Sequence, residues 1–474
     1  MRNMKNYKLS NFCHIYKIKS KVILYHSLLL KEVYSKKMII KILRDLKSRN
    51  GNININDIIK KYHNNKFVKK TIKELIKNKL LIPSNYNEND LLNNMRKKIL
   101  NSKPTIHTMY LIPTNDCNFR CKYCHIENFQ LSNKSLEMSE ETAKKAIDLF
   151  ARLAKLAKSQ KKYKIIFYGG EPLLKWDIVK NSIPYARLKE KEGVFGKKGL
   201  QIVIVTNGSL LTDDMAKFFK KFGISVGVSL DGNKKQNDSM RIYKSGKGTW
   251  KDVVRAINIL KNYDIKTAIS CTIHSKNVNI LPKVGKYFCE KFKIESISFN
   301  LLKGISKKHP SYVSYPRATK KLLETFEVLR KEGIYEDRIM RKIISFVEEV
   351  PLLNDCLAAS GKQIAVSPNG DIGPCHVALL RNDFIIGNLK DKGLIKKILS
   401  VDTWKKWRMN SPIFFEECKN CEALGICGGG CPYDAYLTNK IFPSVDYNFC
   451  SHSKIVLDWM IKDLLKIATG NDNG

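Results

Sequence analysis

Three cysteines lie close together in the sequence, at Cys117, Cys121 and Cys124, with a C-x3-C-x2-C spacing. In a tight loop, each of the three thiolates can bind one iron of a 4Fe-4S cube, which leaves the fourth iron without a protein ligand. An iron with an open site can bind a small molecule and pass it an electron, so the spacing favours chemistry over simple electron storage. Zinc is the alternative, with His125 as a fourth ligand, although structural zinc sites usually use C-x2-C pairs.

A second group of seven cysteines occupies the last third of the chain. Of the thirteen cysteines, only Cys13, Cys271 and Cys289 lie outside the two groups. Such grouping indicates metal or cluster ligation in a reducing cell rather than a scattered set of disulfides, and seven ligands are an awkward number for zinc. The group, spaced around Gly370, consists of Cys356, Cys375, Cys418, Cys421, Cys427, Cys431 and Cys450.

The first cysteine motif, with the aromatic Tyr123 before its last cysteine, resembles the signature of the radical S-adenosylmethionine (SAM) enzymes. In that family the open iron chelates the amino and carboxylate groups of SAM, and an electron from the cluster cleaves the sulfonium to a 5'-deoxyadenosyl radical. The resemblance implies an oxidoreductase in which the cofactors carry the hard chemistry and the protein positions them.

Further motifs resemble the SAM contacts of this family. The segment 168–172 resembles the GGEP motif that receives the amino group of SAM, because its glycines admit a close ligand and Glu171 supplies an anion. Ser229 and Arg241 resemble the residues that hold the ribose and the carboxylate, and a bidentate arginine suits a carboxylate on its own merits. Leu301 falls where a backbone contact to the adenine is expected. The implied SAM-binding residues are Tyr123, Gly170, Glu171, Ser229, Arg241 and Leu301.

The C-terminal cysteine motif resembles the SPASM domain, which carries two auxiliary 4Fe-4S clusters in peptide- and protein-modifying radical SAM enzymes, so three clusters are expected in all. Sulfatase-maturating members have an additional cysteine shortly after their first, and residues 357–364 contain none. The resemblance therefore leaves one auxiliary cluster with an open iron for a substrate thiolate. It implies one ligand set of Cys418, Cys421, Cys427 and Cys450, and another of Cys356, Cys375 and Cys431.

His376 follows Cys375 at a position where sulfatase-maturating members carry an aspartate that takes the substrate proton. Histidine can do the same work near neutral pH, which makes His376 the candidate catalytic residue. The alternative is that His376 hydrogen-bonds a cluster sulfur or a carbonyl.

The middle of the chain must position these groups, and it alternates short apolar runs with segments of helical length. Repeated strand and helix units predict a parallel sheet that is buried on both faces. Six units with functional residues after the strands predict an α/β fold, an open (β/α)6 barrel over residues 105–335, with the site at the carboxyl ends of the strands. The predicted strands are 108–113, 163–168, 201–206, 224–230, 266–273 and 295–300. Residues 340–474 form the SPASM domain.

Residues 1–100 form a separate unit. Apolar patterning predicts strands at 15–18 and 21–30, helices at 37–49, 56–62 and 65–79, and a short strand before Pro83. This order resembles the winged helix-turn-helix domain that binds the leader of a precursor peptide as an added strand in peptide maturases. The unit holds 24 lysine and arginine residues against 6 acidic ones, which favours an acidic leader. A DNA-binding wing and a packing domain without a ligand are the alternatives.

The amino-acid composition limits which cell compartment and which partners we expect. With 43% hydrophobic and 27% charged residues the chain is globular, and it contains no apolar run long enough to predict a membrane span. We therefore expect a soluble cytoplasmic protein. The net charge of +41 would suit nucleic acid, but the lysines are spread along the whole chain, so we expect no nucleic-acid partner.

These expectations together predict a maturase that abstracts hydrogen from a ribosomally made precursor peptide and forms a cysteine thioether cross-link. A carbon–carbon cross-link is compatible with the same residues. The expected partners are a precursor peptide with its leader and an electron donor such as flavodoxin or ferredoxin. The rival functions are formylglycine formation in a sulfatase and redox sensing by a basic nucleic-acid-binding protein.

Overall fold

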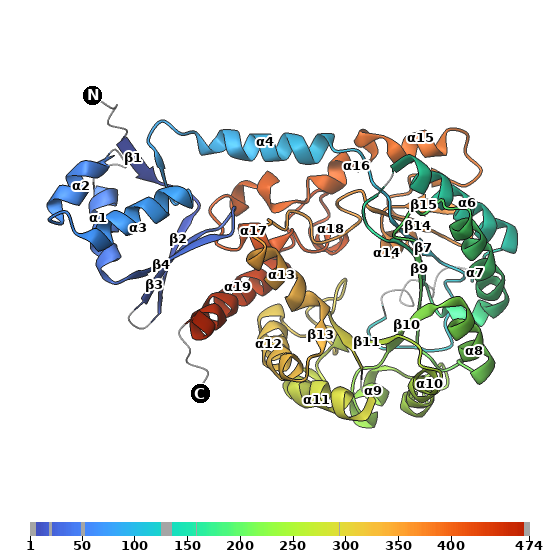
Figure 1. The fold of residues 1–474 in the computed structure, drawn as a ribbon. Coiled ribbons are helices and arrows are strands. Elements are labelled where there is room, and N and C mark those ends of the chain that lie inside the picture. The colour runs from blue at the N-terminus through green and yellow to red at the C-terminus, as the bar shows by residue number, and fades with distance from the viewer. Residues whose placement is uncertain are drawn as a thin grey trace.

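A computed structural model of the protein describes residues 6–18, 21–48, 53–124, 135–157, 159–292 and 294–468. Figure 1 shows a small N-terminal domain at one end and an arc of strands and helices at the other, with the C-terminal cysteine region between and above them. His125, the alternative zinc ligand, lies outside the described residues, as do Arg49, the predicted last residue of a helix, and Asn52.

Six parallel strands form the centre of a ten-stranded sheet and are hydrogen-bonded in sequence order. Strands β7 and β12 pair with outer strands rather than with each other, so the barrel is open, as predicted. Alternate residues of each strand are buried against the covering helices, as in β9. The six strands are β7 (Thr108–Leu111), β8 (Tyr163–Phe167), β9 (Leu200–Thr206), β10 (Ile224–Ser229), β11 (Thr267–Ile273) and β12 (Ser296–Leu301).

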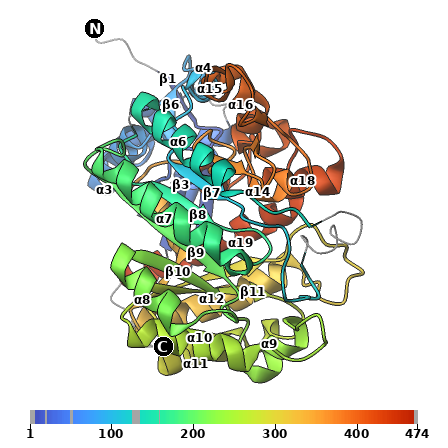
Figure 2. The same cartoon turned by 90° about the vertical axis from the view of Figure 1, so that its right-hand side faces the viewer.

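Helices connect these strands and cover the outside of the arc (Figure 1), and α6 and α7 lie in front of the strands when the molecule is turned (Figure 2). The right-handed connection of parallel strands through helices places all six carboxyl ends at one edge. The connecting elements are α6 (Glu140–Ala157), η1 (Pro172–Lys175), α7 (Trp176–Lys191), α8 (Asp213–Phe222), α9 (Lys234–Met240), α10 (Trp250–Asn262), η2 (Val278–Ile280), α11 (Leu281–Phe292) and α12 (Tyr315–Lys331).

The cysteine region continues the same sheet. Strand β14 (Gln363–Val366) pairs in parallel with β7, and β15 (Asp371–Gly373) and β16 (Gly387–Asn388) follow antiparallel, while β13 (Tyr335–Glu336) extends the other edge beyond β12. The two regions therefore share a backbone framework. The helical elements are α13 (Asp337–Val347), α14 (His376–Leu379), α15 (Leu394–Leu399), α16 (Val401–Arg408), η3 (Pro412–Phe414), η4 (Glu416–Cys418), α17 (Leu424–Cys427), α18 (Pro432–Asn439) and α19 (Tyr447–Ala468).

The N-terminal domain has its own apolar core, formed by two small antiparallel sheets and three helices. The predicted helices and the strand at 81–83 are present within one to two residues, and three further strands occur. One sheet is β2 (Cys13–Ile18), β3 (Lys21–His26) and β4 (Lys31–Lys36); the other is β5 (Ile53–Asn54), β1 (Asn6–Leu9) and β6 (Leu81–Pro83); the helices are α1 (Met38–Ser48), α2 (Ile55–Lys61) and α3 (Lys66–Lys77).

The predicted strand at 21–30 was too long, because the chain leaves β3 at His26 and turns. Leu28 and Leu30 are fully buried although they lie in this turn, since the turn packs on α17 of the cysteine region, where Gly425 N donates to Ser27 O at 2.7 Å. The apolar run continues into the turn because the turn packs on another part of the chain. An apolar run alone does not distinguish such packing from strand pairing.

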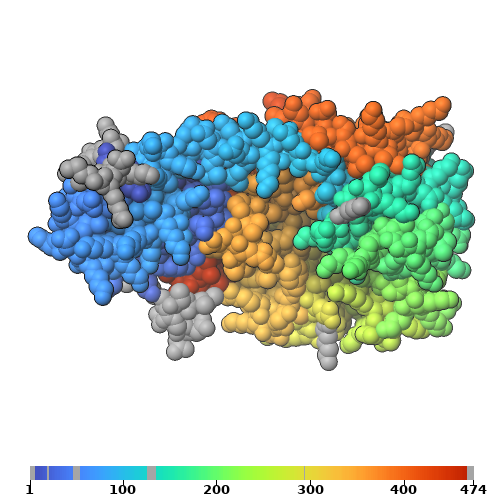
Figure 3. Space-filling view, turned by 45° about the horizontal axis from the view of Figure 1, so that its top comes forward, coloured from blue at the N-terminus to red at the C-terminus, as the bar shows by residue number. Residues whose placement is uncertain are grey.

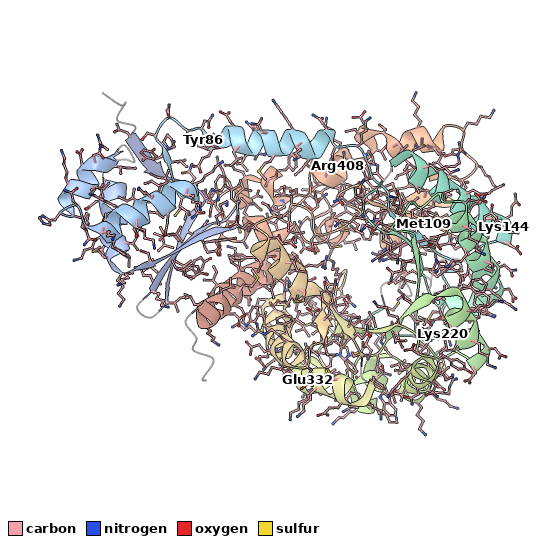
Figure 4. All side chains as sticks on the ribbon, viewed as in Figure 1. Tyr86, Met109, Lys144, Lys220, Glu332 and Arg408 are labelled. Carbon is pink, nitrogen blue, oxygen red and sulfur yellow. The ribbon has the colours of Figure 1, made fainter. Side chains whose placement is uncertain are left out.

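Helix α4 (Glu88–Asn101) leads from the N-terminal domain to the barrel. Figure 4 shows Arg408 of α16 below the end of this helix, and its Nη1 donates to Leu100 O at 3.1 Å. Arg96 Nε donates to Ile413 O at 2.7 Å, so α4 is fastened along the cysteine region. Among the described residues, no helix is both long and apolar enough to cross a membrane.

Candidate functional site

The first cysteine loop follows β7 and is held against the turn that follows β8. Glu171 N donates to Asp116 O at 2.8 Å, and a Cβ atom on Gly170 would lie 2.0 Å from that same oxygen. Gly169 has φ +134°, a conformation that favours glycine. The two glycines are therefore required for the contact between the turn and the cysteine loop.

Glu171 is fully buried behind the loop and accepts three hydrogen bonds. Thr206 Oγ1 donates to it at 2.6 Å and Asn207 N at 2.7 Å, and Leu173 N donates at 3.0 Å. Burial raises the pKa of Glu171, and these hydrogen bonds oppose the rise. The carboxylate thus joins the turns that follow β8 and β9; its contact to the amino group of SAM stays a prediction.

Hydrogen-bond donors face the sulfurs of Cys117 and Cys121. Asn207 Nδ2 lies 3.8 Å from Cys117 Sγ, the Phe119 N–H points to the same sulfur at 3.4 Å, and Arg241 Nη1 lies 3.9 Å from Cys121 Sγ. Burial first, then the charge of Glu171, raises the pKa of Cys117. Donors around buried thiolates suit the ligands of an iron-sulfur cluster, which accept hydrogen bonds through sulfur.

The three cysteines of the loop suit a 4Fe-4S cluster by their number and chemistry. In the described part of the chain, no three His, Cys, Asp or Glu side chains approach closely enough to hold one ion. A 4Fe-4S cube takes one thiolate per iron, and its ligands stand farther apart. The residues present therefore fit the cluster.

The remaining predicted SAM contacts lie at the same edge of the sheet. Ser229 ends β10 beside Ser270 of β11, and Leu301 ends β12 beside Ile273. Tyr123 is buried below the cysteine loop. Arg241 follows α9 and is 8% exposed. The fold thus brings all six predicted residues to the carboxyl ends of the strands.

The seven C-terminal cysteines form two groups. In one group Cys375 packs with Cys356 and Cys431; burial, and then the thiol of Cys431, raises the pKa of Cys375 to about 12 and that of Cys356 to about 11. In the other group burial, and then Cys427, raises the pKa of Cys418 and of Cys450 to about 12, and Cys421 lies among them. The membership equals the two ligand sets implied by the sequence, and ligation itself stays a prediction.

His376 opens α14 and contacts the barrel. Its ring stacks on Tyr110 of β7 with centroids 4.2 Å apart at 18°, and meets the Tyr168 ring edge-on at 4.6 Å. Because Cys375 precedes His376 and Gly169 follows Tyr168, the imidazole lies between one auxiliary cysteine group and the SAM-binding turn. A catalytic role of His376 stays a prediction.

Four polar residues of this region were not predicted as functional. Asn207 follows β9, and its side chain also donates to Asn118 Oδ1 at 2.8 Å and so braces the cysteine loop. Asp231, His274 and Asn277 are fully buried under Tyr123 and Arg241. In the sequence they lie within the first few residues after β10 or β11, a place that many structural residues share.

Comparisons with known proteins agree with this geometry. A model of the radical SAM superfamily matches residues 111–279, and a model of the iron-sulfur cluster-binding SPASM domain matches residues 356–422. An uncharacterized protein of Methanocaldococcus jannaschii is 32% identical over 283 residues, which is 60% of this chain and 88% of that protein. The radical SAM cyclopropyl synthase TigE of Paramaledivibacter caminithermalis is 24% identical over 78% of each chain. A cysteine-type anaerobic sulfatase-maturating enzyme of Clostridium perfringens is 24% identical over 69% of this chain and 89% of its own.

Two solved structures share the fold. Native anSMEcpe with bound AdoMet matches 76% of this chain and 99% of its own with a TM-score of 0.64 at 22% identity. Streptococcus suis SuiB bound to S-adenosylmethionine matches 90% of this chain and 95% of its own with a TM-score of 0.53 at 16% identity. Other structures hold anSMEcpe with AdoMet and the Cp18Cys peptide, and SuiB with the precursor peptide SuiA.

Proposed function

The chain belongs to the radical SAM superfamily and carries a SPASM domain, and from this premise we propose that it forms a cysteine thioether cross-link in a ribosomally made precursor peptide. It is an enzyme of the class that contains sulfatase maturases and peptide modifiers. The finer assignment to a thioether-forming peptide maturase is ours.

The cofactors of the proposal are SAM and three 4Fe-4S clusters. When bound, SAM and the first cluster supply a radical that removes a hydrogen atom from a substrate carbon. Cys117, Cys121 and Cys124 would hold that cluster, and the two C-terminal cysteine groups would hold one cluster each. A small electron carrier such as flavodoxin or ferredoxin would supply the electron.

The observation that carries the proposal is the position of His376 against Tyr110 and Tyr168. Thioether formation joins a cysteine sulfur to a carbon and removes one hydrogen from each. The hydrogen on carbon would leave as an atom to the deoxyadenosyl radical, the hydrogen on sulfur would leave as a proton, and the remaining electron would pass to a cluster that the C-terminal cysteine groups would hold. An imidazole between the SAM-binding turn and the Cys375 group is placed to accept the thiol proton.

The N-terminal domain supplies the proposed leader site. Strand β4 is an edge of its sheet, and α3 lies beside it, with Lys36 Nζ 5.8 Å from the centre of the Phe67 ring. An extended peptide can add to such an edge through main-chain hydrogen bonds. The exposed lysines of α3 would attract an acidic leader; they are Lys66, Lys69, Lys70, Lys73 and Lys77.

Mass spectrometry of the peptide tests the proposed reaction. Candidate substrates are small cysteine-containing peptides encoded beside this protein, incubated without oxygen with reconstituted enzyme, SAM and reductant. The proposal expects the loss of two hydrogens and a cysteine that no longer reacts with an alkylating agent. Loss of two hydrogens with the thiol still reactive would instead identify a carbon–carbon cross-link.

Formylglycine formation is the second candidate, because sulfatase-maturating enzymes are among the relatives. Its product would have the CH2SH group of a cysteine converted to an aldehyde, so the peptide would lose sulfur and two hydrogens and gain one oxygen, which the same spectrum separates from a thioether. Deoxyadenosine without any change in peptide mass would contradict both assignments of the substrate.

The number of clusters is tested by iron analysis. Replacing Cys117, Cys375 or Cys427 by Ala, one at a time, should each lower bound iron by about four atoms per chain, because each lies in a different predicted ligand set. Cys13→Ala is the control, since Cys13 lies in the N-terminal domain, and it should leave the iron content unchanged. If the spectra showed that two of the three variants had lost the same cluster, the predicted number of three clusters would be contradicted.

A further inference from the structure

Asp231 carries a buried carboxylate at the edge of the sheet where the predicted SAM contacts lie. It follows β10 and has no exposed surface. Its Oδ2 lies 3.1 Å from Arg241 Nε and accepts the hydrogen bond of the Tyr123 hydroxyl. Its Oδ1 accepts from Thr272 N at 2.9 Å. Burying a carboxylate with this set of donors costs free energy, so we look for a group that it holds in position.

Asp231 is itself fixed by the surrounding chain. Asn277 Nδ2 donates to its main-chain oxygen at 3.1 Å, and its N–H points to Asn237 Oδ1 at 3.4 Å. His274 Nδ1 accepts from Lys276 N at 3.2 Å, so the neutral ring carries its proton on Nε2, 3.6 Å from the Asp231 carboxylate. The carboxylate therefore has one orientation.

Asp231 in turn fixes Arg241. The guanidinium lies over the Tyr123 ring at 5.6 Å from its centre, and its Nη1 lies 3.9 Å from Cys121 Sγ. Two of its three nitrogens thus face Asp231 and a predicted cluster ligand, while Nη2 makes no hydrogen bond within the part of the chain that the structure describes. Nη2 is the atom left for a ligand carboxylate.

The negative charge of Asp231 compensates the positive charge of Arg241. Burial alone would raise the pKa of Asp231, but the Arg241 guanidinium first, then the nearby His274 ring and the hydrogen bond of the Tyr123 hydroxyl, lower it to about 2, so it is ionised at neutral pH. Removing that charge would leave the buried guanidinium without its carboxylate partner.

We infer that Asp231 is a positioning residue for SAM binding: its carboxylate holds Arg241 across Tyr123 and against Cys121, so that Nη2 meets the SAM carboxylate, and it balances the charge beside the cluster. The inference rests on the proposed SAM contact of Arg241. It adds that the contact depends on a carboxylate from the end of β10.

A double-mutant cycle on SAM affinity tests the inference. The full-length, reconstituted enzyme is titrated with SAM as wild type, Asp231→Asn, Arg241→Gln and the double variant, without any peptide. Each single variant should bind SAM about tenfold or more weakly, and the double variant should bind no more weakly than Arg241→Gln, because Asp231 acts through Arg241. Asp264→Asn, which removes an exposed carboxylate on the outside of the barrel, is the matched control.

Three results would overturn the inference: additive losses in the double variant, unchanged affinity in Asp231→Asn, or unchanged affinity in Arg241→Gln. The last result would also remove the proposed SAM contact of Arg241. None of these results concerns peptide modification, so the proposed reaction succeeds or fails separately. Iron content and thermal unfolding of each variant identify a loss that comes from misfolding.

The reduction potential of the first cluster gives a second readout that does not need SAM. In Asp231→Asn the uncompensated guanidinium should favour the reduced cluster and raise the potential, followed by electron paramagnetic resonance during a redox titration. The double variant should return toward the wild-type value, because both charges are gone. Equal potentials in wild type and Asp231→Asn, with full iron content, would contradict the charge balance.

Discussion

Two aromatic rings determine where the imidazole of His376 can lie. The stack on Tyr110 and the edge contact with Tyr168 hold the ring plane, so the side chain cannot swing to another acceptor without losing both contacts. Aspartate has no ring to stack, and a histidine at this position therefore needs the aromatic pair that this chain supplies.

Replacing His376 should separate radical formation from product formation. In His376→Gln the side chain can still hydrogen-bond but cannot take a proton, so we expect peptide modification to fall by about a hundredfold, the range of general base catalysis. Deoxyadenosine formation should continue at a similar rate. Both products are quantified by mass spectrometry from one reaction. His309→Gln, in the loop after β12, is the control. An equal fall of both products would instead assign His376 a role at the cluster.

His26 predicts a pH-dependent stability of the N-terminal domain. Burial lowers its pKa from 6.5 to about 4, and its Nδ1 accepts from Leu29 N at 3.1 Å, which requires the neutral ring. The unfolded chain binds the proton first, so stability is present above pH 6.5 and is lost as the pH falls toward 4, by at most about 3 kcal/mol.

Hydrogen exchange of the β3 amides measures this loss directly. Between pH 7.5 and pH 5 the opening free energy of wild type should fall relative to that of His26→Gln by about 2 kcal/mol, because Gln keeps an acceptor but does not titrate. His63→Asn, an exposed histidine of the same domain, should follow wild type. Parallel curves for wild type and His26→Gln would refute the assignment.

At the scale of elements, the turn between β3 and β4 joins the N-terminal domain to α17. A Cβ atom on Gly425 would lie 2.6 Å from both Ser27 O and Leu30 Cδ2. The Tyr25 ring stacks on Phe346 of α13 at 5.5 Å, and Lys31 pairs with Glu349 at 2.6 Å. The domain thus packs beside α17, which is preceded by Cys421 and ends at Cys427.

Gly425→Ala should weaken the contact between the N-terminal domain and α17. The clash is with a main-chain oxygen, which cannot move as a flexible side chain does, so we expect a cost of about 1–3 kcal/mol at the contact. Faster hydrogen exchange at residues 27–30 and faster proteolytic release of the N-terminal domain would report it. Gly227→Ala, whose Cβ atom has 3.6 Å to its nearest neighbour, is the control. Unchanged exchange at 27–30 would show that the contact relaxes without loss.

Strong periodicity made the barrel predictable, whereas short or tertiary-dependent elements were missed. Five of the six central strands contain Val, Ile or Phe, β7 contains Met, Tyr and Leu, and each lies next to a helix-sized segment. Strands β5, β13 and β16 have two residues each, too few for any pattern, and α4 has a mostly polar sequence whose packing is decided by α16. The cysteine groups followed from spacing, but the Asp231 network joins four distant segments by single polar residues, which no local pattern marks.

At the scale of the molecule, the proposed leader site and the predicted cofactor site occupy different domains. The space-filling view shows the N-terminal domain at one end and the barrel helices at the other, with α4 and the cysteine region joining them (Figure 3). A leader held at β4 would leave the following part of the same peptide to reach His376. Binding and chemistry can then be tested with different fragments of one substrate.

An isolated leader peptide should bind the enzyme without being modified and should inhibit modification of the full precursor. Lys36→Glu, at the end of β4, should weaken leader binding about fivefold, and the effect should shrink at high salt, because it acts through screened charge. Fluorescence anisotropy of a labelled leader measures the affinity in both salts. Lys198→Glu reverses an equally exposed charge on the barrel and should change nothing. If both variants weaken binding equally, the attraction comes from the net charge of +41 as a whole, and β4 is not the leader site. If only Lys36→Glu weakens leader binding, the N-terminal domain is the domain that binds the leader.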